Sequence, residues 1–511
     1  MPEISGASPS VDRLTSKLSA LLPAHRAAQI DGNRVSFVIG IMFLVMTVFM
    51  FPPALTDVVA GNPDWRVFAG SAFVTGFAGL MLVMTSRGRW SPQVSLKEGF
   101  VLTVASWVVM CAVAAIPFVF FGGDLNLVDA WFEAVSGLTT TGSTILMGLD
   151  HMPPGILLWR SIIQWIGGIG TVLMALIMLP FLRVGGMQLF QAESSDRTDK
   201  FAPRATELMS LITVTYSVLT VLAAVAYRVA GMSTFDALNH AMTTVATSGF
   251  STHDLSLGHF SEPAVQWVAV VFMLAASLPL VVYIKAVRNR SPAMFADEQV
   301  VGFAKIAVVS VLALTTWYWW QWRDVPLPET LRVVAFNTVS ILSTTGYAMG
   351  DYTMWGVGAT GIFLLLMFLG GCTGSTTGGI KTFRLQVMYK TARAYVGRLM
   401  SPNRVLVSTF NDRQITPDIS SSVLAYVAVM FSSVMAFTLV LSLFDLDFVT
   451  SLSGAVSAVA NIGPGLGAII GPAGNYSQLP DGAKFMLTIA MLLGRLEFFT
   501  VLVLINRNFW R

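Results

Sequence analysis

The segment AVSGLTTTG (134–142) decides the architecture of this chain, because three further segments align with it without gaps. These segments are AMTTVATSG (241–249), TVSILSTTG (338–346) and AVSAVANIG (455–463). Each begins with a small residue, then Val or Met, then Ser or Thr, and each ends in glycine. Similar lengths of chain separate the copies. We therefore interpret them as an internal repeat, the feature to recognise before any other.

Each copy has the same surroundings in the chain. An apolar run precedes it, a short amphipathic stretch leads into it, and a second apolar run follows it. The stretches that lead in are Leu127 to Leu138, Thr234 to Val245, Thr330 to Leu342 and Phe448 to Val459. Each is too short to cross a bilayer. The repeating unit is therefore predicted to be a helix, a half-helix ending in a glycine-terminated extended segment, and a second helix.

The composition excludes a soluble globular enzyme. Of the 511 residues, 54% are hydrophobic and only 12% are charged, whereas about 25% charged residues are usual in a soluble domain. The net charge is only +3, and the basic residues form short clusters rather than one extended face, which argues against a nucleic-acid partner. The two cysteines, Cys111 and Cys372, lie far apart and support neither a disulfide framework nor a cysteine metal site.

Ten apolar runs predict membrane spans, since a bilayer core needs about 20 apolar residues per helix. They are 34–53, 65–86, 98–121, 155–182, 206–230, 262–287, 301–321, 355–395 (interrupted), 420–444 and 481–507. The fold class is therefore an all-α polytopic membrane protein. The polar segment 1–33 lacks the residue order of a cleavable signal peptide, and we expect it to be a retained cytosolic segment.

The distribution of charge predicts the orientation. Most Lys and Arg residues fall in alternate connections, such as Arg87 and Lys97 or the run from Lys381 to Arg413. Basic loops stay in the cytoplasm, so both termini are expected there. The opposite connections are acidic and contain Asp57, Asp64, Asp129, Glu133, Asp150, Asp236 and Asp254, with few bases, among them Arg160. These acids either concentrate cations before a pore or are ordinary features of exposed loops.

The chemistry of the repeated segment suits a cation. Short polar residues leave the backbone accessible, and glycine permits dihedrals that turn carbonyl oxygens toward an axis. Rings of carbonyls replace the water shell of an alkali cation, and the half-helices would direct their partially negative C-terminal ends at the cavity. The competing interpretation is helix packing through small residues, which does not explain four copies in one context.

These residues resemble the Trk/Ktr/HKT superfamily of potassium transporters, and within it the bacterial TrkH-type subunit. The resemblance covers nearly the whole chain from about residue 34. It is carried by LWRSIIQWIGGIG (158–170), TTTGST (139–144), ATSGFSTHD (246–254), STTGYAMGD (343–351), GGCTGSTTGGIKTFR (370–384), ANIGPGLG (460–467) and GRLEFFTVLVL (494–504). It implies four helix–pore-helix–helix repeats in a pseudo-fourfold arrangement around one pore, plus two extra N-terminal transmembrane helices.

The resemblance also implies a potassium-selective filter. Its ion-binding residues would be Thr140, Thr141, Gly142, Thr247, Ser248, Gly249, Thr344, Thr345, Gly346, Asn461, Ile462 and Gly463. In sodium-preferring plant relatives serine replaces the first filter glycine, so glycine at all four positions favours potassium. The fourth copy departs most from the others, and a less symmetric filter than that of a tetrameric channel is expected.

The eighth span is interrupted at 370–379 by a segment with five glycines, which cannot form a stable helix interior. Ile380 separates Gly379 from Lys381, so the segment is not a P-loop. We expect a mobile intramembrane loop below the filter, and the resemblance implies a gate formed by Gly370, Gly371, Gly374, Gly378, Gly379 and Arg495. The alternative for the loop is a passive helix kink.

Arg495 lies near the middle of the predicted last span, with Glu497 two positions on. Charges inside a membrane are expensive and usually face a water-filled cavity or a partner. The resemblance implies that Arg495 faces the pore as an electrostatic barrier; the alternative is an arginine that snorkels from a helix end. Four histidines on the outer side lack the spacing of metal ligands, and we interpret them as surface or vestibule residues: His151, His240, His253 and His259.

The expected function is potassium uptake across the bacterial inner membrane, with potassium as the transported ligand and no cofactor. The alternative within transport is a sodium-permeable or ion-coupled potassium symporter. A membrane-embedded transferase would need a nucleophile, a base or metal-binding carboxylates gathered near one membrane face. The acids of this sequence are scattered, so no enzymatic activity is expected. The resemblance implies a homodimer on a cytosolic TrkA-type nucleotide-binding subunit, and the basic segment from Lys381 could contact membrane lipid.

The predicted organisation follows from these assignments. It comprises a cytosolic segment (1–33), two extra helices (34–97), and pore repeats at 98–183, 205–288, 301–413 with the gating loop 370–379, and 418–511.

Overall fold

The computed structural model describes residues 30–88, 95–122, 125–178, 201–289, 296–401, 403 and 406–511. The predicted cytosolic segment 1–33 lies outside the described residues, apart from 30–33. The described chain is helical except for loops and one small antiparallel hairpin, β1 (Thr409–Phe410) with β2 (Arg413–Gln414).

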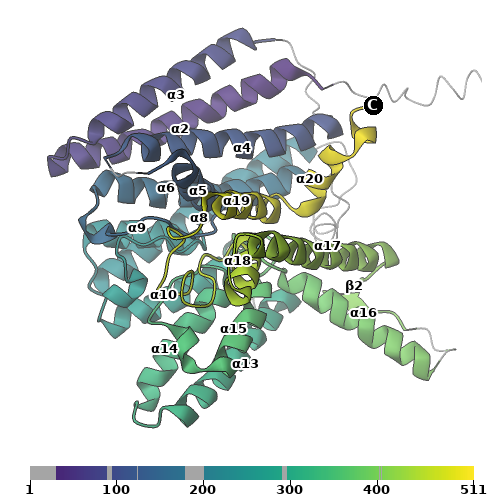
Figure 1. Ribbon diagram of the computed structural model, residues 1–511. Coiled ribbons are helices and arrows are strands. Elements are labelled where there is room, and N and C mark those ends of the chain that lie inside the picture. The colour runs from purple at the N-terminus through teal and green to yellow at the C-terminus, as the bar shows by residue number, and fades with distance from the viewer. Residues whose placement is uncertain are drawn as a thin grey trace, which may run out of the picture.

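Four copies of one unit follow one another along the chain (Figure 1). The first contains α4 (Leu96–Phe120), the half-helix α5 (Leu127–Leu138) and α6 (Pro154–Met178). The second contains α8 (Phe201–Val229), the half-helix α9 (Thr234–Val245), α10 (Pro263–Ala276) and α11 (Leu280–Asn289). The third contains α13 (Glu298–Gln321), the half-helix α14 (Leu327–Leu342), α15 (Val357–Phe368) and α16 (Thr382–Met400). The fourth contains α17 (Pro417–Ser442), the half-helix α18 (Phe448–Ala460), α19 (Asp481–Arg495) and α20 (Phe498–Ile505).

Three of the half-helices begin at side-chain caps, and all four end at the repeated glycine segments. Asn126, Ser233 and Asp447 accept hydrogen bonds from the backbone N–H groups three residues later, at the starts of α5, α9 and α18. After the first three half-helices come single 3₁₀ turns, η1 (Leu149–His151), η2 (Ser256–His259) and η3 (Tyr352–Trp355), and η4 (Arg507–Phe509) lies at the end of the chain. The half-helix α14 instead begins after Pro326 without a side-chain cap.

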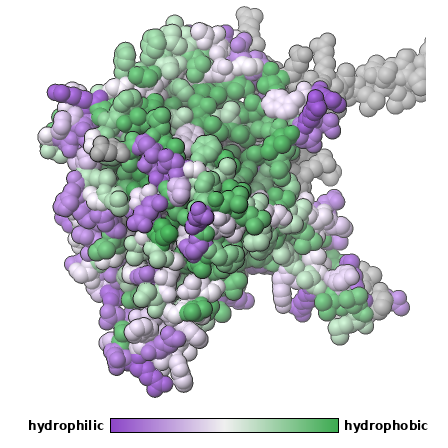
Figure 2. Space-filling view, viewed as in Figure 1, coloured by the Kyte–Doolittle hydropathy of each residue, from purple (hydrophilic) through white to green (hydrophobic). Residues whose placement is uncertain are grey.

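The surface is that of a multi-pass membrane protein. Among the described residues, seven helices are long and apolar enough to cross a membrane, or up to nine if each of two bent pairs counts as one span. Figure 2 shows apolar side chains in a broad band across the middle of this face, with hydrophilic side chains toward its ends. Phe73, Val59 and Leu439 are among the strongly exposed apolar residues, as expected for groups that face lipid instead of water.

Two predicted spans are bent, where the sequence had suggested continuous helices. The axes of α10 and α11 differ by 87°, and those of α19 and α20 differ by 107°. The first bend ends at Pro279, which cannot donate a backbone hydrogen bond, and the second contains Glu497 at a φ of 59°. Both bends lie beside the interrupted eighth span. At the first bend, Leu280 N–H donates to Gly374 O and Cys372 N–H donates to Ser277 O. At the second, Arg495 Nη1 donates to Thr376 O.

The two extra helices, α2 (Gly32–Ala60) and α3 (Trp65–Thr85), form a hairpin at one edge of the bundle (Figure 1). A Cβ on Gly40 would lie 3.0 Å from Gly79 O, and a Cβ on Gly79 would lie 3.0 Å from Gly40 O. Glycine at both positions therefore allows the backbones to approach closely, as is common between membrane helices. Helix α2 also packs on α4 and α6, which joins the hairpin to the first repeat.

Candidate ion pathway

The four repeated segments share an unusual backbone. The residue two before each glycine has a left-handed conformation, with φ of 54° at Thr140, 52° at Thr247, 53° at Thr344 and 53° at Asn461. The glycines are also left-handed, with φ of 86° at Gly142, 74° at Gly249, 82° at Gly346 and 116° at Gly463. The segments are therefore not simply extended, as the sequence had suggested. Threonine is strained in this conformation and asparagine tolerates it better, which explains why the fourth copy can carry Asn461.

The same hydrogen bond anchors every copy to its own half-helix. The N–H of the residue before each glycine donates to the carbonyl five residues earlier. These pairs are Thr141 to Ser136 (2.9 Å), Ser248 to Thr243 (3.0 Å), Thr345 to Ser340 (2.9 Å) and Ile462 to Ser457 (3.0 Å). Because geometry and bonding recur in all four copies, the repeat seen in the sequence is also a repeat of local structure.

The four segments close into a ring. A Cβ on Gly142 would lie 1.9 Å from Ser248 O, one on Gly249 would lie 2.0 Å from Thr345 O, and one on Gly346 would lie 2.0 Å from Ile462 O. A Cβ on Gly463 would lie 2.9 Å from Thr141 O and complete the circuit. Each copy thus packs its glycine against the carbonyl of the next copy, so the four repeats surround one axis in chain order. Glycine is required at each position because no side chain fits.

The carbonyl groups of this ring are buried but largely unbonded. Ser248 O accepts a hydrogen bond from Gln164 Nε2 (2.9 Å), and Gly463 O accepts three, from Ser143 Oγ (2.8 Å), Ser457 Oγ (2.9 Å) and Tyr476 OH (2.8 Å). The other carbonyls of the twelve predicted filter residues accept no hydrogen bond from the residues that the structure describes. Buried carbonyls normally accept hydrogen bonds, so a cluster of unbonded ones is unusual. Their lone pairs remain available to coordinate a desolvated cation. The fourth copy breaks the symmetry at Gly463.

Two cavities meet the ring from opposite sides. Gly142, Gly249, Gly346 and Gly463 all line an outer cavity, which is bordered by the loops after the half-helices. Asn461 instead lines an inner cavity together with parts of α6, α16, α19 and the 370–379 loop. The four repeated segments therefore lie between two cavities.

A buried ion pair supports the ring from behind. Arg160 Nε lies 2.8 Å from Glu133 Oε1, and both side chains are almost completely buried. Arg160 also donates to Ser251 O (2.7 Å) and Thr144 Oγ1 (3.1 Å), and Glu133 accepts from Thr144 Oγ1 (2.9 Å). The pair therefore ties the segments after the first two filter glycines together. The charge distribution along the sequence places both residues in the outer loops, and no local signal indicates the pairing.

Asp57 also belongs to the interior and not to an acidic mouth. It is fully buried, and its Oδ1 accepts a hydrogen bond from Gly155 N–H (2.7 Å).

The predicted loop packs against the ring of repeated segments. Thr376 Oγ1 donates to Val245 O (3.1 Å) and accepts from Thr247 Oγ1 (3.1 Å), while Gly378 N–H donates to Thr344 Oγ1 (2.8 Å). A Cβ on Gly378 would lie 2.0 Å from Ala460 O. The loop thus contacts the second, third and fourth copies.

The remaining glycines let the loop fold back on itself between α15 and α16. A Cβ on Gly370 would lie 2.1 Å from Gly378 O, and one on Gly371 would lie 2.8 Å from Ser277 O. Gly374 and Gly379 have φ of 86° and 64°. The loop base is closed by hydrogen bonds from Gly370 N–H to Ile380 O and from Ile380 N–H to Phe368 O, both 2.9 Å. The segment is a closed loop and not a kinked helix.

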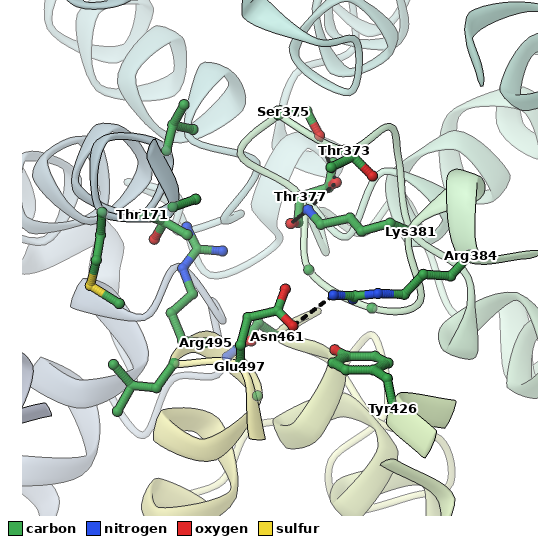
Figure 3. Close-up of a pocket in the computed structure, with 18 of the residues that line it drawn as sticks. Thr171, Thr373, Ser375, Thr377, Lys381, Arg384, Tyr426, Asn461, Arg495 and Glu497 are labelled. Carbon is green, nitrogen blue, oxygen red and sulfur yellow. Dashed lines mark hydrogen bonds and ion pairs between the residues drawn. The ribbon is translucent and has the colours of Figure 1, made fainter. Parts of the chain in front are cut away.

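Arg495 lies at the C-terminal end of α19, at the bend before α20 and so inside the predicted last span. Its Nη1 donates to Thr376 O (3.0 Å), and its side chain is buried, while its Nε and Nη2 have no hydrogen-bond partner within the described chain. Glu497 does not neutralise it, because Glu497 Oε2 pairs with Arg384 Nη2 at 2.7 Å. Figure 3 shows Glu497 turned toward Arg384, with Arg495 extending away from that pair. An unpaired guanidinium thus borders the inner cavity under the filter.

The histidines do not all lie on the surface. His240 is fully buried, with its ring nitrogens 2.8 Å from Asp236 O and 2.9 Å from Ser251 Oγ. His151 is exposed. His253 and His259 lie in the outer loop of the second repeat beside Asp150, and the hydrogen bond from His253 lowers the pKa of the Asp150 carboxyl. Their proximity could not be predicted from spacing, because Asp150 belongs to another repeat.

The model of one protein family, described as TrkH, a cation transport protein, matches residues 66–296 and 299–510. The chain belongs to the TrkH family. The matched ranges include all four filter segments, the 370–379 loop and Arg495. The resemblance seen in the sequence is therefore confirmed, and with it a transporter family rather than an enzyme family.

Individual members of the TrkH family match over nearly their whole length. The Trk system potassium uptake protein TrkI of Halomonas elongata is 45% identical over 478 residues, which cover 93% of this chain and 96% of that protein. The Trk system potassium uptake protein TrkH of Escherichia coli K12 is 33% identical over 485 residues, covering 93% of this chain and 99% of that one. The crystal structure of the potassium transporter TrkH from Vibrio parahaemolyticus matches with a TM-score of 0.86 and 29% identity, covering 94% and 99%. The pseudo-fourfold fold is thus that of the family.

Proposed function

We propose that this chain carries potassium into the bacterial cell through the ring of four glycine segments. The observation that carries the proposal is the closed circuit of glycines against neighbouring carbonyl oxygens, which gathers buried and unbonded carbonyls from four repeats at one axis. Such carbonyls can replace the water shell of potassium. The names of the similar proteins from Halomonas elongata and Escherichia coli, both potassium uptake proteins, support this substrate.

The twelve residues predicted from the sequence form the filter in this proposal. The gate is the loop with Gly370, Gly371, Gly374, Gly378 and Gly379, together with Arg495. Support comes from the contacts of Thr376 and Gly378 with the filter base, and from the unpaired charge of Arg495 beside the inner cavity. A buried cation repels a second cation. The path opens when the loop and Arg495 move away from the axis.

The chain would lie in the inner membrane with both termini in the cytoplasm, and its units would follow the division predicted from the sequence. The basic residues of α16 and the C-terminus support this orientation, since Figure 1 shows the free end of α16 and the C-terminus on one side of the molecule. Basic segments remain on the cytoplasmic side.

A homodimer and a cytosolic TrkA-type nucleotide-binding subunit complete the proposal. The resemblance to TrkH-type proteins suggests both partners. On this chain, α16 presents exposed apolar residues, among them Tyr395, Leu399 and Met400, next to basic ones such as Arg393 and Arg398. Exposed apolar side chains on a projecting polar helix suit a protein partner.

The test is growth at low potassium and rubidium uptake in a bacterium without its own potassium uptake systems, with sodium as competitor. Wild type should restore growth, and Gly142→Ser should make uptake sensitive to sodium. Gly148→Ser is the matched control, because Gly148 has a similar φ of 73° but no atom within 4 Å of its ideal Cβ. No rescue by wild type, even with a co-expressed TrkA-type subunit, would contradict the proposal.

A sodium-permeable or ion-coupled transporter is the second candidate, because Gly463 O is held by three hydroxyl groups and weakens the fourth side of the filter. It predicts sodium uptake by wild type, or rubidium uptake that requires sodium or a proton gradient.

A further inference from the structure

The outer loops of the first two repeats bring two imidazoles and a carboxylate together. One possible ligand atom from each of Asp150, His253 and His259 lies within 4.8 Å of the others. His253 Nδ1 is 2.5 Å from Asp150 Oδ1, and His259 Nδ1 is 3.9 Å from the same oxygen. Two ring nitrogens from one loop thus converge on one carboxylate from another repeat.

Packing holds the two imidazoles in place. Their rings are stacked with centroids 3.6 Å apart and planes 4° from parallel. The Phe260 ring meets both edge-on, at 5.3 Å from His253 and 5.2 Å from His259. These contacts keep the two imidazoles side by side next to Asp150.

A second carboxylate lies behind His253. Asp236 Oδ1 is 3.4 Å from His253 Nε2, within ion-pair distance, although this nitrogen has no hydrogen-bond partner in the described chain. Asp236 itself accepts hydrogen bonds from Ser233 Oγ (2.6 Å) and Thr252 Oγ1 (2.7 Å). A carboxylate on the far nitrogen of a histidine is the usual support of a metal-binding imidazole, because it fixes the tautomer and the ring. Within the described chain, no Lys or Arg lies within ion-pair distance of Asp150 or Asp236.

We propose that Asp150, His253 and His259 bind a transition-metal ion of the Zn²⁺ type. Two imidazole nitrogens and a carboxylate oxygen are a common three-ligand set for zinc, with a fourth position left for water. Zinc bonds of about 2.0–2.1 Å place tetrahedral ligand atoms about 3.3 Å apart. The distances from Asp150 Oδ1 to the two imidazole nitrogens, 2.5 and 3.9 Å, therefore need to change by less than about 1 Å. The two stacked rings must also turn out of their parallel arrangement so that both nitrogens point at the ion. Mg²⁺ and Ca²⁺ prefer oxygen ligands and do not suit this set.

The site lies at the entrance of the ion pathway. His253 lines the outer cavity that also contains the four filter glycines. A bound divalent ion would add positive charge to this entrance and link the outer loops of the first and second repeats. External zinc is therefore expected to slow cation entry. Only this consequence rests on the proposed function, because the metal site itself does not depend on what the pathway carries.

Binding is tested by titrating ZnCl₂ into the purified full chain in detergent and measuring heat. We expect one Zn²⁺ per chain, with affinity lowered about tenfold or more in His259→Ala and in Asp150→Asn. His151→Ala is the matched control, because His151 is exposed and adjacent to Asp150 but outside the cluster. Wild type without zinc binding, or equal affinity in wild type and His259→Ala, would overturn the proposal. Absorption of bound Co²⁺ gives a second readout, since tetrahedral bands should appear in wild type and vanish in both variants.

The transport consequence is measured as rubidium uptake with and without external ZnCl₂, expressed as a ratio for each variant. Zinc should lower uptake several-fold in wild type and in His151→Ala, but not in His259→Ala. An unchanged ratio in a wild type that binds zinc would overturn the inhibitory consequence. Absent rubidium uptake without zinc would count against the proposed function instead, and calorimetry would still decide the metal site.

Discussion

Gly249→Ala should damage the filter because the ring leaves no space for a methyl group. An ideal Cβ on Gly249 lies 2.0 Å from Thr345 O, whereas real Cβ atoms essentially never approach a heavy atom below 3.0 Å. The Thr345 carbonyl must therefore move by about 1 Å or more, in a ring packed tightly on all sides. This displaced oxygen belongs to the third copy, so a substitution in the second repeat changes the geometry of the third.

The loss can be estimated from the contact that is displaced. A hydrogen bond to a charged group contributes about 1.5–3 kcal/mol, and we take one carbonyl–cation contact as comparable. Since about 1.4 kcal/mol is tenfold in affinity, the apparent affinity for rubidium should fall roughly 10- to 150-fold. The left-handed conformation adds about 1–2 kcal/mol of strain for alanine, which lowers stability without altering selectivity.

The assay is the concentration dependence of initial rubidium uptake, with Gly148→Ala beside Gly249→Ala. Gly148 has a φ of 73°, close to the 74° of Gly249, but open space around its Cβ. The control carries the same backbone strain and should keep the wild-type affinity. Equal affinity for rubidium in both variants would refute the steric reasoning. The backbone strain that both variants share would then account for any change in affinity.

Three further changes test the surroundings of the filter. Arg495→Gln should raise leak current in proteoliposomes, while Arg495→Lys should keep it low, since the barrier is the positive charge; equal leak in both would remove charge as the cause. Gly378→Ala should also raise leak, because its Cβ would lie 2.0 Å from Ala460 O and push the loop from the filter, whereas Gly361→Ala, with open space, should not. Glu133→Gln leaves Arg160 buried without its charge partner and should cost about 3–5 kcal/mol. The exposed Glu329→Gln should cost less than about 1 kcal/mol, and similar Tm values for the two variants in thermal unfolding would argue against the buried pair.

The repeats were predictable because their signals are local. Three signals lie within one stretch of chain in each repeat. They are a glycine after short polar residues, a half-helix too short for a bilayer, and apolar runs on both sides. The glycine-rich loop was predictable for the same reason, since its composition excludes a helix interior. The bend at Pro279 had a local signal as well, because proline interrupts a helix, whereas the bend at Glu497 had none.

Contacts between repeats were not predictable in this way. Glu133 and Arg160 were assigned to outer loops because each is an isolated charge in the sequence, and only folding brings them to 2.8 Å. His253 and Asp150 are likewise joined by the packing of two loops from different repeats. The role of Glu497 was also hidden, since its partner Arg384 lies on another helix.

The sequence by itself determined that this chain crosses a membrane several times, repeats one unit four times and places glycine at the end of each half-helix. These properties follow from hydropathy, length and backbone freedom, which act over short stretches of chain. Tertiary structure alone decided that each glycine meets the next copy's carbonyl, that the loop rests on three copies, and that Arg495 remains without a carboxylate partner within the described chain. Those outcomes depend on distances between residues far apart in the chain, and only close packing of the four repeats sets such distances.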